Sequence, residues 1–246
     1  MAEIFRSYFY DAKKNKKRSA VSTILFMVFF VVLMVGVMGG LFTWLSGTIC
    51  EPLVSAGLGW MYFVLMGLLA IFLGAFGSVF NTYSGLYLSK DNDLLLALPI
   101  PVRSIMVSRL LGVYLMGLMY SAVVIVPAII VYWQNVPFTA GVFFGTLLLL
   151  IDISVIVLVL SCLLGWAVAK ISTKLKSKSF ITVLISLLFF AAYYFCYFKA
   201  SLFIKKMLAN AAVYGANIKG KAYPLYLFGR VGEGDGLSML VWTAAV

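Results

Sequence analysis

An aspartate inside a long apolar run is the residue of this sequence best placed to do chemistry. No other acid lies within the long apolar runs of the 246-residue chain. An ionisable group is expensive to place in hydrocarbon, and one found there is a candidate for moving an ion or a substrate. Asp152 lies eighteen residues before Lys170, the next charged residue, which is about 27 Å of helix. Asp152 therefore has a possible transport role, although we expect it to reach the outer headgroup zone, where a carboxylate is solvated or hydrogen-bonded.

The other patterns that suggest catalysis are incomplete. Residues 215–221 have the Gly-x-x-x-x-Gly-Lys spacing of a phosphate-binding loop, but Ala222 follows where a Ser or Thr holds magnesium. The glycine-rich residues 232–236 are interpreted as a turn leading into the final apolar run. The chain has no histidine, which excludes histidine-based metal sites and catalytic triads. We predict no catalytic residue, no metal site and no cofactor in this chain, and therefore no enzyme activity of its own.

The composition predicts where such a chain resides. Hydrophobic residues make up 64% of the sequence and charged residues 11%, whereas typical soluble domains have roughly 25% charged residues. Apolar runs of about 20 residues are what a hydrocarbon core about 30 Å thick requires of a helix. The sequence therefore predicts an all-α fold, a polytopic bundle of transmembrane helices.

The apolar runs predict five full spans and a partial sixth. The full spans are Ala20–Thr43, Gly57–Phe80, Ile105–Tyr132, Gly145–Ala169 and Phe180–Phe198. A further run begins at Leu237 and has ten residues, about 15 Å of helix and half of a crossing. We expect either that the chain is cut short there or that this run lies in the interface.

The domain organisation follows from these spans. Residues 1–19 form a basic cytoplasmic or interfacial segment, and residues 20–246 form the transmembrane domain. Within the domain, residues 81–104 are a cytoplasmic loop, and residues 199–236 are extracytoplasmic or interfacial. In the first segment, Ile4, Phe5, Tyr8 and Phe9 recur at helical spacing. This spacing predicts a helix lying along the membrane surface, although a frayed tail is the alternative.

The basic residues predict the orientation, because Lys and Arg in short loops favour the cytoplasmic side. Thirteen of the nineteen lie before the first span, between spans two and three, just inside span three or after span four, and they agree on a cytoplasmic N-terminus. The other six follow span five, where alternation of the spans places them outside. The net charge of +11 predicts contact with anionic lipids and not with nucleic acid, since the basic residues cluster beside spans.

Span two has a face of small residues. Gly67, Ala70, Gly74 and Gly77 recur at spacings of three and four. A groove of small residues lets a second helix approach closely. The sequence predicts helix packing through this face, and both a partner helix within the chain and a second subunit stay open.

Between spans two and three lies a short charged segment, Lys90–Arg103, that ends in two prolines. An aspartate at its start can cap a helix, three leucines give it an apolar edge, and the prolines end it. The segment predicts a helix of about two turns parallel to the membrane, with an ordinary loop as the equal alternative. The residues concerned are Asp91, Asp93, Leu94, Leu95, Leu98, Pro99 and Pro101.

The run from Lys90 to Arg109 resembles the cytoplasmic loop between the second and third helices of ABC-2 type transporter permeases. It has an acidic opening, then Leu-Leu-Leu-Ala-Leu-Pro-Ile-Pro, and then Val-Arg-Ser-Ile and Ser-Arg-Leu-Leu at the start of a span. The basic N-terminal segment, Val126-Pro127 and Pro224-Leu-Tyr-Leu-Phe are also similar to that class. Members commonly have six helices per unit, so the stop at Val246 departs from a complete unit.

The resemblance implies a function and partners. It implies a multi-pass membrane subunit of an ATP-driven exporter in the plasma membrane. Such a subunit pairs with a second permease subunit or half, which can be identical or different. It also docks onto a separate cytoplasmic ABC ATPase subunit that hydrolyses ATP. The alternative is an ion-coupled secondary transporter or channel, which needs broken helices and polar residues at the membrane midplane. Carried over to this chain, the ATPase-coupling residues are Asp91, Asp93, Leu94, Leu95, Leu98, Pro99 and Arg103.

Overall fold

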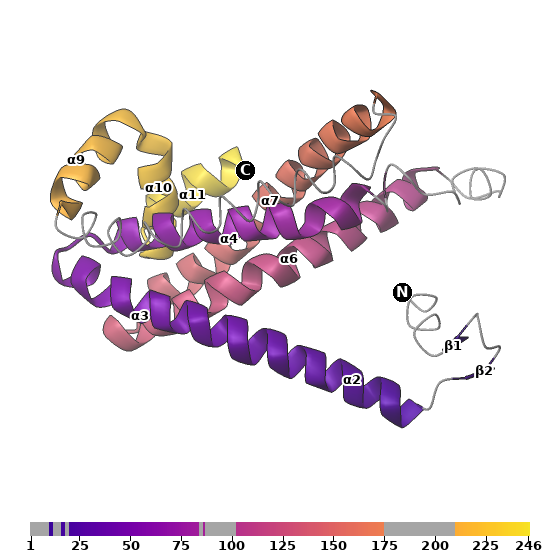
Figure 1. Cartoon of the computed structure of the whole chain (residues 1–246). Helices are drawn as coiled ribbons and strands as arrows, with labels where there is room; N and C mark the ends of the chain where they lie inside the picture. Colours follow the sequence, from indigo (N-terminus) through magenta and orange to yellow (C-terminus); the bar gives the residue numbers. More distant parts are fainter. Residues whose placement is uncertain (1–9, 12–15, 18–19, 84–85, 87–101, 175–209) are drawn as a thin grey trace.

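Helices make up nearly all of the described chain (Figure 1). The computed structural model describes residues 10–11, 16–17, 20–83, 86, 102–174 and 210–246. Besides the helices, the described chain has a pair of two-residue antiparallel strands, β1 (Tyr10–Asp11) and β2 (Lys16–Lys17). Four helices are long and apolar enough to cross a membrane. The predicted all-α class is therefore confirmed, and the four apolar helices suit the predicted multi-pass membrane protein. The predicted surface helix at residues 4–9 lies outside the described residues.

The first span is the start of a longer helical run than predicted. α2 (Ala20–Leu33) leads through a π-helical turn, η1 (Met34–Met38), into α3 (Gly39–Ser55). The prediction that this span ends at Thr43 and that a loop follows is wrong, because residues 45–55 form an amphipathic helix. Of their polar residues, Thr48, Glu51 and Ser55 are exposed and Ser46 is buried. The buried residues of α3 recur at spacings of one, three and four: Phe42, Ser46, Ile49, Cys50 and Leu53.

The next three long helices correspond to the predicted spans two to four, although the first two residues of predicted span two, Gly57 and Leu58, lie in the turn before its helix. They are α4 (Gly59–Thr82), α6 (Val102–Asn135) and α7 (Ala140–Lys174). α6 and α7 extend past the predicted spans at both ends. Span five, residues 180–198, lies outside the described residues.

α4 lies at the centre of the bundle and packs against α3, α6 and α7. Of its most apolar stretch, 56% is buried, against 22% for the stretch that includes α3. The small-residue face predicted from the sequence meets side chains from within the chain: Gly74 faces Val157 of α7 and Gly77 faces the ring of Tyr120 of α6. The Tyr62 hydroxyl adds a hydrogen bond to the Ala128 carbonyl of α6 at 2.8 Å.

Three short helices close one end of the bundle. They are α9 (Ala211–Lys221), α10 (Tyr223–Gly232) and α11 (Gly236–Ala245), and Figure 1 shows them together above α4. α10 packs on α4 and α7, with the Phe228 ring against Gly67, and α11 packs on α7. The apolar run predicted to begin at Leu237 is α11, and the segment predicted from residue 199 contains α9 and α10.

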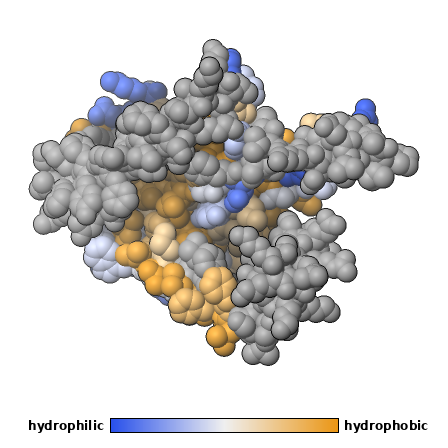
Figure 2. Space-filling view, turned by 45° about the vertical axis from the view of Figure 1, so that its right-hand side comes forward, coloured by the Kyte–Doolittle hydropathy of each residue, from blue (hydrophilic) through white to orange (hydrophobic). Residues whose placement is uncertain are grey.

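The outward surface of the long helices is apolar. Leu25 of α2 is 71% exposed, as is Trp44 of α3. Figure 2 shows hydrophobic side chains over much of the coloured surface, with few hydrophilic ones between them. In water such a surface would associate or aggregate, so lipid chains are its natural surroundings.

Two glycines, Gly229 and Gly145, allow the short helices to approach the bundle closely. Substitution of each by alanine tests this packing. A Cβ at Gly229 would collide with the Trp60 carbonyl oxygen, and one at Gly145 with the Val231 carbonyl oxygen. Because backbone cannot move aside cheaply, we expect Gly229→Ala and Gly145→Ala each to destabilise the protein by about 1–3 kcal/mol. Thermal unfolding of the purified protein in detergent measures this.

Gly47→Ala is the matched control, because a Cβ at Gly47 meets nothing within 4 Å. Alanine is a better helix former than glycine by up to about 1 kcal/mol. This variant should melt at the wild-type temperature or slightly above it. Equal melting temperatures for all three variants would contradict the close packing described above.

Candidate functional site

Of the residues predicted to couple to an ATPase, only Arg103 lies in the described part of the chain. Asp91, Asp93, Leu94, Leu95, Leu98 and Pro99 lie outside the described residues. Arg103 lies in the first turn of α6 with its side chain exposed. α6 begins at Val102, directly after Pro101, and proline is well tolerated at the start of a helix. The segment that carries the resemblance therefore leads without a spacer into a helix of 34 residues.

Asp152 is buried, with 2% of its surface exposed. α7 begins at Ala140, twelve residues earlier, so Asp152 lies about 18 Å along the helix from that end. Its carboxylate accepts a hydrogen bond from the Thr243 hydroxyl of α11 at 3.4 Å. The expectation that Asp152 is either solvated or hydrogen-bonded is thus resolved in favour of the hydrogen bond. The choice between solvation and a hydrogen bond could not be made from the sequence, because no sequence pattern indicates that α11 lies along α7.

The surroundings of Asp152 hold no metal site in the described chain. Among the described residues, no group of three His, Cys, Asp or Glu side chains could hold a metal ion. The glycine-lysine pattern of residues 215–221 lies within helix α9 and not in a loop that could surround a phosphate. Asp152 is therefore a single carboxylate between two helices.

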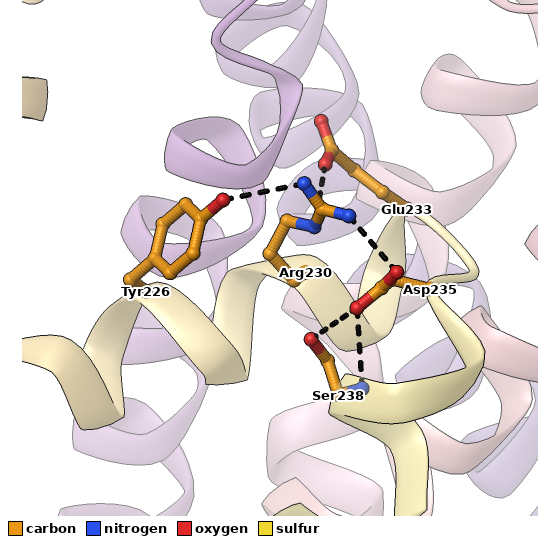
Figure 3. Close-up of polar contacts among 5 residues, drawn as sticks. All are labelled: Tyr226, Arg230, Glu233, Asp235 and Ser238. Carbon is orange, nitrogen blue, oxygen red and sulfur yellow. Dashed lines mark hydrogen bonds and ion pairs between the residues drawn. The ribbon is translucent and has the colours of Figure 1, made fainter. Parts of the chain in front are cut away.

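A second polar group, which we call the Arg230 cluster, joins α10 to α11 (Figure 3). It consists of Tyr226, Arg230, Glu233, Asp235 and Ser238. Arg230 Nη2 lies 2.9 Å from Asp235 Oδ1, and Nη1 donates a hydrogen bond to the Tyr226 hydroxyl at 3.2 Å. Arg230 Nε lies 3.7 Å from Glu233 Oε2 and has no hydrogen-bond partner. The guanidinium therefore binds Asp235 closely and Glu233 loosely.

Asp235 is the N-cap of α11. Its carboxylate accepts hydrogen bonds from the backbone N–H of Ser238, at 3.2 Å, and from the Ser238 hydroxyl. Gly234 precedes it with φ +84° and touches the backbone of Gly141 at the start of α7, a left-handed conformation that favours glycine. The Ser238 hydrogen bonds, together with Arg230, hold the pKa of Asp235 below its usual range.

Glu233 faces the start of α4. The Trp60 backbone N–H donates a hydrogen bond to its carboxylate, and a Cβ on Gly59 would lie 2.7 Å from its Oε1 and 3.2 Å from the Tyr132 hydroxyl. The Glu233 side chain is 25% exposed. Burial raises its pKa above the ordinary glutamate value, although Arg230 and the Trp60 N–H both act to lower it.

The turn at residues 232–236 was predicted from the sequence, whereas the cluster built on it was not. Gly232 ends α10 and Gly236 begins α11, as a turn interpretation requires. The available signal was the spacing of Arg230, Glu233, Asp235 and Ser238, in which the first pair and the last pair are each three residues apart. Spacing of three joins neighbours on a helix and an N-cap to its helix.

The cap at Asp235 can be tested by substitution. Asp235→Ala removes the cap and the closest partner of Arg230, and we expect it to cost more than the roughly 1 kcal/mol of a lost cap. Asp235→Asn keeps the cap and removes the charge, so its cost should be smaller. Thermal unfolding in detergent gives both values, with the exposed acid Glu51, changed to Ala, as the control.

The same variants predict a pH dependence. Because the folded pKa of Asp235 is lowered from 3.8, its ionised form contributes stability that is present above pH 3.8 and is lost as the pH falls through the folded pKa. The wild type and Asp235→Asn should therefore converge in stability at low pH. A stability difference that stays constant into that range would contradict the Arg230–Asp235 pairing.

Asp152 gives an independent prediction. An ionised carboxylate is costly in such a buried site, whereas an asparagine can still accept the Thr243 hydrogen bond. Asp152→Asn should therefore unfold at the wild-type temperature or above it, and Thr243→Val should lose about 0.5–1.5 kcal/mol. A marked loss of thermal stability in Asp152→Asn would show instead that the charge is compensated by a partner.

Comparison with known proteins identified no relative of this chain. No protein-family model matches the chain, and no curated protein or solved structure matches it either. The sequence and structure therefore establish a helical protein with several apolar helices that suit a multi-pass membrane protein. Its described polar sites are a buried carboxylate on α7 and the Arg230 cluster at one end of the bundle.

Proposed function

We propose that this chain is the membrane-spanning permease subunit of an ATP-driven ABC exporter in the plasma membrane. The observation that carries the proposal is the similarity of residues 90–109 to the coupling loop of ABC-2 type permeases. In support, that segment lies between α4 and α6, two of the four helices that could cross a membrane. The proposal includes five full spans, a partial sixth and a cytoplasmic N-terminus.

The proposed mechanism is mechanical. ATP-driven closure of the partner subunits displaces residues 90–101, and the displacement is passed to Arg103 in the first turn of α6. α6 packs against α3, α4 and α7, so a shift of this helix acts on the whole bundle. Pro127 interrupts the hydrogen bonds of α6 near its far end and provides a point at which the helix can bend. Catalysis belongs to the ATPase subunit.

The proposed orientation determines which side the Arg230 cluster faces. The turns α3–α4 and α6–α7, residues 56–58 and 136–139, contain no Lys or Arg, and the positive-inside rule assigns such turns to the outside. Glu233 contacts Gly59 beside the first turn, and Gly234 contacts Gly141 beside the second. The Arg230 cluster therefore shares the extracytoplasmic end with both turns.

The test is co-purification of the tagged chain from its native host, with and without the double change Asp91→Lys and Asp93→Lys. We expect the wild type to recover an ATPase subunit in stoichiometric amount and the double variant to lose most of it, since the change reverses two charges on the coupling segment. Quantitative mass spectrometry of the eluates measures the ratio.

Glu51→Lys is the matched control, because this exposed acid lies near the end of α3, at the opposite end of the bundle from Arg103 in the first turn of α6. It should recover as much ATPase subunit as the wild type. Absence of an ATPase from every form, under conditions that preserve a known transporter complex, would refute the exporter proposal.

An ion-coupled secondary transporter is the second candidate, and the burial of Asp152 favours it. Such a carrier needs a titratable or ion-binding group inside the bundle, and Asp152 is 2% exposed. Transport in vesicles separates the two candidates. Transport that stops when the ion gradient is collapsed, while ATP remains, supports the carrier, and transport that continues supports the exporter.

A further inference from the structure

The Arg230 cluster contains two acids that share one cation unequally. Asp235 is 31% exposed and Glu233 25%, but burial is the largest effect on the pKa of Glu233 and the Ser238 hydrogen bond is the largest on that of Asp235. Their partners differ as well. Asp235 has the 2.9 Å contact with Arg230 and two hydrogen bonds from Ser238, whereas Glu233 has the Trp60 N–H and a cation at 3.7 Å. The negative charge of Asp235 is therefore well compensated and that of Glu233 is not.

Glu233 also lies where three helices meet. It follows the last residue of α10, faces the start of α4 at Gly59, and lies near Tyr132 of α6. The docking of α10 onto α4 brings it there, because Gly229 packs on the Trp60 backbone and Gly232 on the Phe63 ring. Any separation of α10 from α4 would return the Glu233 carboxylate to water.

We propose that Glu233 makes the attachment of the α10–α11 hairpin proton-dependent, so that the hairpin is held more tightly when Glu233 is neutral and more loosely when it is ionised. The neutral acid keeps an oxygen to accept the Trp60 N–H and no longer needs the distant guanidinium. The Arg230–Asp235 pair stays ionised and is the constant part of the attachment.

The groups around Glu233 fix the sign of this dependence. They are Arg230 on α10, Asp235 in the turn, the Trp60 N–H on α4 and Tyr132 on α6. Arg230 stays protonated and Tyr132 stays neutral near pH 7, so Glu233 is the group that titrates. Because its pKa is raised in the docked state, docking is favoured at lower pH and weakens as the pH rises through that pKa.

Hydrogen exchange of the full chain in lipid nanodiscs tests the proposal. Backbone amides of residues 236–246 should exchange several-fold more slowly in Glu233→Gln than in the wild type at pH 8, because glutamine is uncharged at all pH values. Comparison at equal pH removes the intrinsic pH dependence of exchange. The ratio of the two rates should approach one as the pH is lowered and Glu233 takes up its proton.

Glu51→Gln is the control, since it removes an acid from exposed surface on α3 and should leave the exchange of α11 at the wild-type rate. Equal or faster exchange in Glu233→Gln at pH 8 would overturn the proposal, because the charge on Glu233 would then be holding the hairpin in place. A ratio that does not change with pH would overturn it as well.

A measurement on the wild type alone covers the case in which Glu233→Gln fails to fold. Trp60 packs edge-on against Tyr226 at 5.0 Å, so a fluorotryptophan at this position reports on the cluster, with its signal assigned by Trp60→Phe. Its ¹⁹F signal should titrate with a midpoint above 4.5, the ordinary glutamate value, while that of Trp166 on α7 stays constant. No titration, or a midpoint at or below that value, would refute the proposal.

The proposal concerns this chain alone and rests on neither an ATPase partner nor a transported substrate. Its experiments need only the purified membrane protein. Failure of the proton-dependent attachment would leave the exporter proposal unchanged, and failure of the co-purification test would leave the attachment unchanged.

Discussion

Close approach of helices to α4 is the constraint on which the rest of the structure depends. In lipid the hydrophobic effect does not drive one helix against another, so van der Waals contact and hydrogen bonds must hold the bundle together. The glycines of α4 provide that contact for three different helices: Gly67 receives Phe228 of α10, Gly74 receives Val157 of α7 and Gly77 receives Tyr120 of α6. The position of α10, and with it the Arg230 cluster, therefore follows from a glycine in a helix far away in the sequence.

Polar side chains in the interior divide into those that are satisfied locally and those that are not. Ser154 and Ser161 donate to carbonyls four residues earlier in α7, and Thr146 does the same. Such hydroxyls need no partner from another helix, although the Ser161 hydroxyl also forms a hydrogen bond with the Ser78 hydroxyl of α4. A carboxylate cannot satisfy itself in this way, because an ionised acid has no donor. Asp152 depends on Thr243 of α11 for this reason, and its burial links the last helix of the chain to the fourth apolar one.

The sequence predicted the features that depend on a single helix and missed those that depend on contact between two helices. Apolar length alone predicted α4, α6 and α7, since each must cross the same thickness of hydrocarbon. The amphipathic end of α3 was mistaken for a loop because its polar residues are visible in the sequence, whereas the neighbours that bury Ile49 and Leu53 are not. The Arg230 cluster was missed because the role of Glu233 depends on Gly59 and Trp60, which become its neighbours only when α10 docks.

Contacts between helices in the folded chain also constrain the orientation of the bundle in the membrane, which a count of basic residues alone does not. The positive-inside rule acts on loops during insertion, and the basic residues after span five opposed the assignment made from the other thirteen. In the folded chain Arg230 is bound to Asp235 in the turn that touches Gly59 and Gly141, and Lys219 lies over the Tyr226 ring of the same cluster. Packing thus ties these two cations to the end that carries the α3–α4 and α6–α7 turns. They therefore face whichever side those turns face.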